Sequence, residues 1–361
     1  MTDSIYHRLA RVLDTLPNGF PATPSGVEIK LLRKIFEPDE AELFCDLRLK
    51  YETPEEVARR TGRPLENLGE KLNRMWRRGL LFGIDFGTVQ VFRILPWVFG
   101  IYEFQLNRMD REFAELCEEY APVFGRQFFG NKPQLMQVVP VEKELRNLQA
   151  TLPYEKVSAI IETGLSFGLN ECICKKEKHI LDKGCRKPLE VCLAIAPVPG
   201  VFDHHPLIKK AITKEEAYEV LRISEEAGLV HLTSNVENGH YYICNCCGCC
   251  CGVLRSINEL GISEAINSAF HAEIDPSQCI GCGLCADERC QIHAIHAGPD
   301  GIHRVDRQKC IGCGLCVTHC PVEAIQLIRK ETADLVAPPK DEKEWFAKRG
   351  DLRGVDFSGY R

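Results

Sequence analysis

The sequence "QCIGCGLC" at residues 278–285 recurs as "KCIGCGLC" at residues 309–316. Each copy places three cysteines three positions apart, and a fourth cysteine follows after a short gap. The first copy supplies Cys279, Cys282, Cys285 and Cys290, and the second supplies Cys310, Cys313, Cys316 and Cys320. The repeat therefore predicts a small unit over residues 273–330 that is organised around eight regularly spaced thiols.

The second copy ends in Cys320-Pro321, and its spacing matches the cysteine run of bacterial ferredoxins. Residues 273–330 thus resemble the ferredoxins that hold two [4Fe-4S] clusters. In that family the fourth cysteine of each run ligates the other cluster. The resemblance implies cluster I on Cys279, Cys282, Cys285 and Cys320, and cluster II on Cys310, Cys313, Cys316 and Cys290. The first copy departs from the family in its longer gap before Cys290 and in Gln291, where proline is usual.

Glycines and aliphatic residues alternate with the cysteines of both copies. The glycines are expected to let the loops turn tightly and to bring amide N–H groups near the sulfurs: Gly281, Gly283, Gly312 and Gly314. The aliphatic residues are expected to keep water away from the clusters: Ile280, Leu284, Ile311 and Leu315. Both effects tune the reduction potential of such a cluster.

The chain has 361 residues, 20 cysteines and a net charge of −6. Disulfide-dense chains are usually short and secreted, whereas this chain is long and its start lacks a basic region followed by an apolar one. The most apolar window, residues 91–104, is too short to span a bilayer. We therefore expect a cytoplasmic protein without a membrane span, whose reduced thiols bind metal.

Ten more cysteines lie in a middle region, residues 151–272. They are Cys172, Cys174, Cys185 and Cys192, followed by Cys244, Cys246, Cys247, Cys249, Cys250 and Cys251 in the stretch "CNCCGCCC". Adjacent residues of an extended chain point to opposite sides, so this stretch cannot aim all its thiols at one cluster. The ten thiols are expected to bind one or two additional iron–sulfur clusters, one of which could be a non-cubane cluster with an accessible iron. Zinc sites or redox disulfides are the alternative.

The order of these cysteine segments, ahead of a two-cluster ferredoxin unit, resembles multi-domain iron–sulfur ferredoxin-like proteins of anaerobic microbes, which implies electron transfer. The "CCG" runs at 246–248 and 250–252 resemble the cysteine-rich domain of heterodisulfide reductases. That second match is too short to imply the same activity.

The amino-terminal part resembles a winged-helix domain. Helices are expected near residues 39–50 and 64–78, with a further helix begun by the capping box of Thr53 and Glu56. Two strands around a turn at 85–88 follow. The expected division of the chain is an N-terminal helix and linker at 1–26, a winged-helix-like domain at 27–106, a helical connector at 107–150, the cysteine-rich domain at 151–272, the ferredoxin domain at 273–330 and an extended tail at 331–361.

A few other residues carry weaker signals. His204 and His205 are interpreted as part of a solvated loop rather than as metal ligands. The basic segment 175–187 is expected to balance the charge of a cluster, to attract an acidic partner, or to be a solvated loop. Cys45 and Cys117 are expected to be buried and inert.

The sequence predicts an α+β protein that carries single electrons, alone or as a subunit of an anaerobic oxidoreductase complex. Its partners would be redox proteins. No nucleotide-binding loop is present, so flavin, NAD and ATP are not implied on this chain. An electron-transfer component of an oxidoreductase is favoured over a stand-alone catalyst. Nucleic acid is not expected as a partner, because the exposed residues of the helix at 64–78 have mixed charge. Two alternatives stay open: a redox-sensing DNA-binding regulator, and a reductase with a catalytic cluster on residues 244–251.

Overall fold

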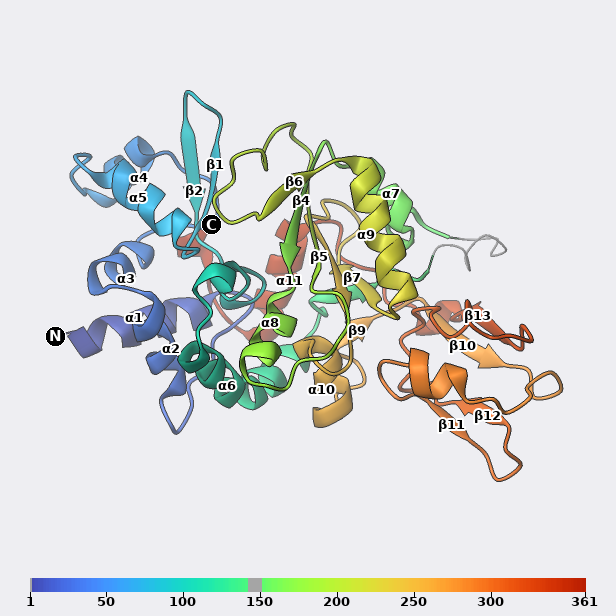
Figure 1. Ribbon diagram of the computed structural model, residues 1–361. Coiled ribbons are helices and arrows are strands. Elements are labelled where there is room, and N and C mark those ends of the chain that lie inside the picture. The colour runs from blue at the N-terminus through green and yellow to red at the C-terminus, as the bar shows by residue number, and fades with distance from the viewer. Residues whose placement is uncertain (1, 142–150) are drawn as a thin grey trace.

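The computed structural model describes residues 2–141 and 151–361, with side chains described from residue 4 onward, as a mixed α+β chain (Figure 1). The helices are α1 Thr2–Thr15, α2 Val27–Ile35, α3 Pro38–Phe44, α4 Pro54–Thr61, α5 Leu68–Arg77, α6 Arg111–Phe129, α7 Val157–Glu162, α8 Ile173–Ile180, α9 Lys214–Glu226, α10 Gly252–Leu260 and α11 Glu342–Arg353. None of the described helices combines the length and the apolar character needed to cross a membrane.

The strands form one large sheet and three small pairs. They are β1 Phe82–Asp85, β2 Gln90–Arg93, β3 Met136–Val138, β4 Ser166–Glu171, β5 Glu190–Ala196, β6 Lys210–Ile212, β7 Val230–Ser234, β8 Tyr242–Cys246, β9 Ile266–Asn267, β10 Phe270–Ile274, β11 Ile295–Ala297, β12 His303–Val305 and β13 Ile325–Arg329. The large sheet has the order β6-β4-β5-β8-β7-β3-β9, and only β3 and β9 pair in parallel.

The amino-terminal region contains the predicted helices and the predicted hairpin. The Thr53 side chain accepts a hydrogen bond from the Glu56 N–H while Glu56 accepts one from the Thr53 N–H, so the predicted capping box starts α4. The helix expected near 39–50 is α3, which already ends at Phe44. Strands β1 and β2 pair antiparallel with Phe82 opposite Arg93. The winged-helix resemblance itself stays a prediction.

Three of the ten middle cysteines lie on strands of the large sheet: Cys192 on β5, and Cys244 and Cys246 on β8. Its helix α9 starts at the Thr213 cap and packs on β4 and β5, while α6 from the amino-terminal half packs on α8 and α10. Strand β3 joins the sheet from within the segment expected to be a connector. The region that holds the middle cysteines therefore includes residues from before position 151, where the cysteine-rich domain was expected to begin.

The carboxy-terminal cysteine repeats lie at one end of the molecule, at the lower right in Figure 1. Two antiparallel pairs, β10 with β13 and β11 with β12, hold the two loops. The Val141 N–H donates to the Cys313 carbonyl at 3.0 Å, and the Ser268 hydroxyl donates to the Ile311 carbonyl at 2.7 Å. The second loop is therefore fastened to the body of the protein.

The tail expected to be extended instead contains helix α11. Asp341 caps the helix by accepting from the Glu344 N–H at 2.9 Å. Trp345 and Arg349 are one helical turn apart and both buried; the Trp345 indole donates to the Gln134 carbonyl at 2.8 Å. The tail is polar overall, but these two large side chains share one face and anchor the helix to the end of α6, which the average composition does not reveal.

His205 is buried, which corrects the interpretation of its segment as a solvated loop. Its ring lies 5.3 Å from that of Trp76 and 5.4 Å from that of Phe82, so it packs against the amino-terminal region. Its neighbour His204 is exposed, as expected. Burial lowers the pKa of His205 to about 4. The aromatic surroundings contain no second metal ligand among the contacts described, so His205 acts as a packing residue.

The lowered pKa of His205 predicts a pH-dependent contribution to stability. An unfolded histidine has a pKa of about 6.5, so acid protonates the unfolded chain first and favours unfolding. Relative to His205→Phe, the natural protein should lose about 2 kcal/mol of unfolding free energy between pH 7 and pH 5. Anaerobic urea unfolding of both proteins at the two pH values measures this difference. An equal loss of unfolding free energy in the two proteins would show that the pKa of His205 is not lowered by folding.

Candidate metal centres

Two cavities occur in the region of the cysteine repeats, and four cysteines line each. The first cavity is lined by Cys279, Cys282, Cys285 and Cys320. The second is lined by Cys290, Cys310, Cys313 and Cys316. Each cavity thus combines three cysteines of one repeat with the fourth of the other. The structure brings together the same two sets that the ferredoxin resemblance implies.

The loops that form these cavities need their glycines and place amide groups against sulfur. Gly312 has a φ of 61°, and a Cβ there would lie 2.3 Å from the Phe270 carbonyl oxygen. The Ala294 N–H donates to the Cys290 Sγ at 3.1 Å, and the Ala324 N–H donates to the Cys320 Sγ at 3.3 Å. Both donors lie four residues after their cysteine. Cys290 therefore has the same N–H···S contact as Cys320, despite the longer gap before it.

The two loops differ in exposure, which corrects part of the shielding prediction. Ile311 and Leu315 are buried at 4% and 1% exposure, as expected. Ile280 is 64% exposed and Leu284 is 36% exposed, so the first loop faces solvent. The reason is tertiary: Ile311 and Leu315 join the main hydrophobic core, whereas nothing in the described chain covers the first loop.

The chemistry of the cavities fits metal-bound thiolates. Burial raises the pKa of Cys285 to about 11 and that of Cys313 to about 12, and it also raises the pKa of Cys316. Without a cation these sulfurs would keep their protons, because a buried thiolate lacks solvation. A bound metal supplies the missing positive charge and releases the protons.

The ten middle cysteines separate into two groups. The four-cysteine group is Cys185, Cys247, Cys249 and Cys250, whose sulfurs all lie within 4.8 Å of one another. The six-cysteine group is Cys172, Cys174, Cys192, Cys244, Cys246 and Cys251, whose thiols are joined by hydrogen bonds between neighbours. Three cysteines of the stretch at 244–251 thus belong to each group.

Local backbone geometry explains this division. Cys244 and Cys246 lie two residues apart on strand β8, so they point to the same side, and Asn245 between them points away. The Asn245 amide donates to the Val191 carbonyl at 2.6 Å, which fixes the strand. A tight turn then follows, in which the Cys251 N–H donates to the Cys247 carbonyl at 3.1 Å. Cys251 becomes the N-cap of α10, and the Leu254 N–H donates to its sulfur.

Within the six-cysteine group, crowding and burial keep the thiols protonated when no metal is bound. The pKa of Cys172 is raised by its hydrogen bond with Cys174 and by burial, and that of Cys244 is raised by its contact with Cys192. Such a group of mutually repelling sulfurs requires cations to become thiolate. The donor set therefore fits an iron–sulfur cluster.

Part of the segment expected to be a basic loop is helix α8, and Lys175 on it is fully buried. Its ammonium donates to the Pro188 carbonyl at 2.7 Å and to the Asn245 carbonyl at 3.4 Å. The charge of Lys175 favours the thiolate forms of both Cys172 and Cys247, which belong to different groups. Lys175 thus supplies positive charge to both groups of sulfurs.

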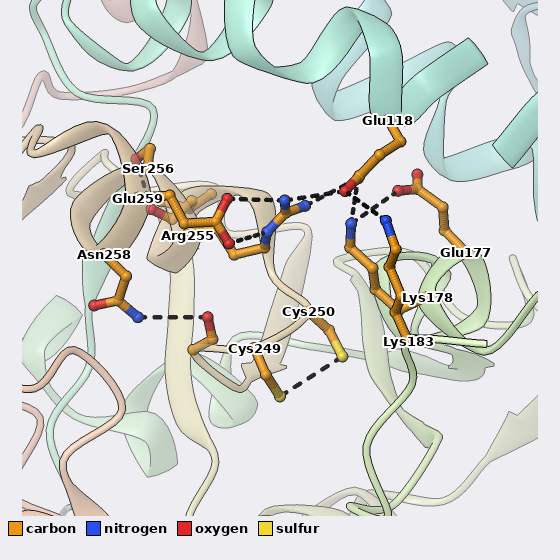
Figure 2. A network of polar contacts seen from close by, with 12 residues as sticks. Glu118, Glu177, Lys178, Lys183, Cys249, Cys250, Arg255, Ser256, Asn258 and Glu259 are labelled. Atoms are coloured by element: carbon orange, nitrogen blue, oxygen red, sulfur yellow. Dashed lines mark hydrogen bonds and ion pairs between the residues drawn. The ribbon is translucent and has the colours of Figure 1, made fainter. Parts of the chain in front are cut away.

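A charged network holds both cysteine segments against α6 (Figure 2). The Glu118 carboxylate on α6 pairs with Lys178 on α8 and, at 3.2 Å, with Arg255 on α10. Burial alone would raise the pKa of Glu118, but the hydrogen bonds from Lys178 and Arg255 outweigh it and the pKa is lowered. Glu118 therefore joins the helix after Cys172 to the helix after Cys251. This role of Glu118 could not be predicted from the sequence, because Glu118 lies far from every cysteine cluster along the chain.

The middle cysteines also contact the carboxy-terminal repeats. The Gly248 N–H donates to the Gln291 side-chain oxygen at 3.1 Å, and the Asn258 amide donates to the Gln291 carbonyl at 3.0 Å. Val230, which pairs with Cys246 in the sheet, lines the second cavity. The second cavity is therefore adjacent to the six-cysteine group, and the turn at Gly248 touches the residue after Cys290.

Gly248→Ala should disrupt this contact. A Cβ at position 248 would lie 1.9 Å from the Gln291 carbonyl oxygen, whereas a Cβ at Gly252 meets nothing within 4 Å. We expect Gly248→Ala to lower the free energy of unfolding by roughly 2–4 kcal/mol, as overpacking against backbone does. The matched control Gly252→Ala should be neutral or slightly stabilising. Anaerobic denaturant unfolding compares the two, and equal stabilities would refute the close approach.

A family model described as the 4Fe-4S dicluster domain matches residues 272–327. Comparisons with curated proteins and with solved structures gave no match to this chain. The matched residues cover the repeats and both of the cavities that they line. The chain therefore contains a 4Fe-4S ferredoxin-like domain, and its cysteine-rich region is consistent with iron–sulfur binding.

Proposed function

We propose that this protein transfers single electrons between redox proteins, as a carrier or as the electron-transfer subunit of an oxidoreductase complex. The observation that carries the proposal is the pair of cavities in which three cysteines of one repeat meet the fourth of the other. That crossed arrangement is the ligand pattern of two-cluster ferredoxins. Each cavity has four cysteines, one for each iron of a cubane, so no iron would be left open to bind a substrate.

Two [4Fe-4S] clusters are assigned to these cavities. Cluster I takes Cys279, Cys282, Cys285 and Cys320, and cluster II takes Cys310, Cys313, Cys316 and Cys290. When bound, such a cluster accepts and releases one electron. The chain contributes thiolates and the amide donors of Ala272, Ala294 and Ala324, which stabilise negative charge on sulfur.

The difference in exposure gives the two clusters different roles. The cavity of cluster I opens beside exposed Ile280, Cys282 and Leu284, an apolar rim suited to contact with a redox partner. The cavity of cluster II is bounded by Val230 of the large sheet. Electrons therefore enter or leave through cluster I and reach the interior through cluster II.

A third cluster is assigned to the six-cysteine group. Val230 lies opposite Cys246 in the sheet, so this group is the next set of sulfurs inward from cluster II. Six thiols exceed the four ligands of a cubane, which leaves room for an unusual cluster there. The DNA-binding alternative gains no support from α5, where Lys71 is paired with Asp39 at 2.8 Å and Arg77 with Asn73 at 2.9 Å.

Iron and sulfide content test the cluster assignment. Anaerobically purified protein should hold more than about eight irons per chain, because two cubanes account for eight and the middle region adds more. Cys320→Ala should lower the iron content by about four and abolish the magnetic coupling between the two reduced clusters. Cys45→Ala removes a buried cysteine outside every group and is the control. Fewer than eight irons in the natural protein would refute two cubanes.

The position of Lys175 predicts an effect on potential. Removing a positive charge beside sulfur disfavours the reduced, more negative cluster, so Lys175→Met should lower the midpoint potential of the middle cluster. The expected shift is on the order of 50–100 mV, from a charge interaction of roughly 1–2 kcal/mol. Lys176→Met is the control, because Lys176 is paired with Glu171 at 3.2 Å and is partly exposed. A redox titration followed by electron paramagnetic resonance measures both, and an unchanged potential in Lys175→Met would contradict the placement.

A further inference from the structure

The sulfurs of the four-cysteine group lie closer together than those of any other set of cysteines in the described chain. The Cys185 sulfur lies 3.8 Å from that of Cys247 and 3.8 Å from that of Cys250, and the Cys249 and Cys250 sulfurs are 3.7 Å apart. All four lie within 4.8 Å of one another. No other group of three or more potential metal ligands in residues 2–141 and 151–361 is as compact.

These separations match one tetrahedral metal ion. A metal–sulfur bond of about 2.3 Å in a regular tetrahedron places the sulfurs about 3.8 Å apart. A cluster of several irons binds each cysteine through a different iron and so holds the sulfurs further apart. The cysteines that line the two ferredoxin cavities are spread in this way, since none of their sets is as compact. The same chain thus contains both kinds of sulfur arrangement.

We propose that Cys185, Cys247, Cys249 and Cys250 bind a single tetrahedral metal ion through four thiolates. Zn²⁺ and mononuclear iron are the ions that prefer this donor set. The proposal concerns a site separate from the clusters assigned above, and it does not rest on the electron-transfer function.

The environment of the four sulfurs suits a cation. The four sulfurs converge from two segments of the chain, and the Cys185 sulfur lies 3.8 Å from those of both Cys247 and Cys250. Cys247 and Cys250 are buried, Cys185 is half-buried and Cys249 is exposed, which gives the ion a route from solvent. Lys175 offsets part of the negative charge that four thiolates leave on a divalent ion.

Such an ion would cross-link two distant segments of the chain. Cys185 follows α8, whereas the other three ligands lie in the turn between β8 and α10. Gly248 in the middle of that turn donates to Gln291, the residue after a proposed ligand of cluster II. The ion would therefore hold the turn in the conformation that contacts the ferredoxin-like domain.

The test measures zinc, iron and acid-labile sulfide in the full chain, purified without oxygen. Cys185→Ala and Cys249→Ala should each lose about one metal ion per chain with no loss of sulfide, because a mononuclear site contains none. Loss of zinc identifies Zn²⁺, and loss of iron alone identifies mononuclear iron. Cys45→Ala, at a buried cysteine outside the group, should lose neither.

Two outcomes would overturn the proposal: joint loss of iron and sulfide, which places a cluster at these cysteines, or retention of all metal. If both variants fail to fold, the natural protein decides. Its zinc and iron together should exceed sulfide by about one per chain, and zinc that is present should show four sulfurs at about 2.3 Å and no neighbouring metal by X-ray absorption. Iron equal to sulfide in the absence of zinc refutes a mononuclear site.

Discussion

Closely packed thiolates repel one another, and burial removes the water that would stabilise them. This constraint governs every cysteine-rich part of the chain. Burial and neighbouring sulfurs raise the pKa of most of these thiols, so the sulfurs become thiolates only when cations are bound. Metal binding and correct packing of the cysteine segments are therefore coupled, and the protein has to place positive charge where the sulfurs gather.

The fold meets this requirement with a small number of connections between distant elements. Lys175 lies within reach of both groups of middle cysteines, and Glu118 joins α8 and α10, which flank them, to α6 (Figure 2). Gln291 connects the turn at Gly248 to the ferredoxin-like domain. Because each connection bridges different regions, the groups of cysteines occupy fixed positions relative to one another.

The two repeats are nearly identical in sequence and unequal in their surroundings. The loop of the second repeat packs into the main core, while the loop of the first exposes Ile280 to solvent. Two similar sequences thus form cavities with different surroundings: the first lies beside exposed residues, and the second is adjacent to the large sheet. The proposed direction of electron transfer rests on this difference in exposure.

The sequence by itself determined the ferredoxin-like unit and the capping box at Thr53, because these features depend on local spacing. It also predicted the crossed sets of cysteines and a metal-binding role for the middle region. It could not place Lys175, Glu118 or His205, or the helix in the tail, because their roles depend on side chains far apart along the chain. The division of Cys244 to Cys251 into two groups was also decided by tertiary structure. Because side chains alternate along a strand, the thiols of residues 244–251 cannot all point to one side. Which of them join which group depends on tertiary packing, which places Cys185 in one group and Cys172 in the other.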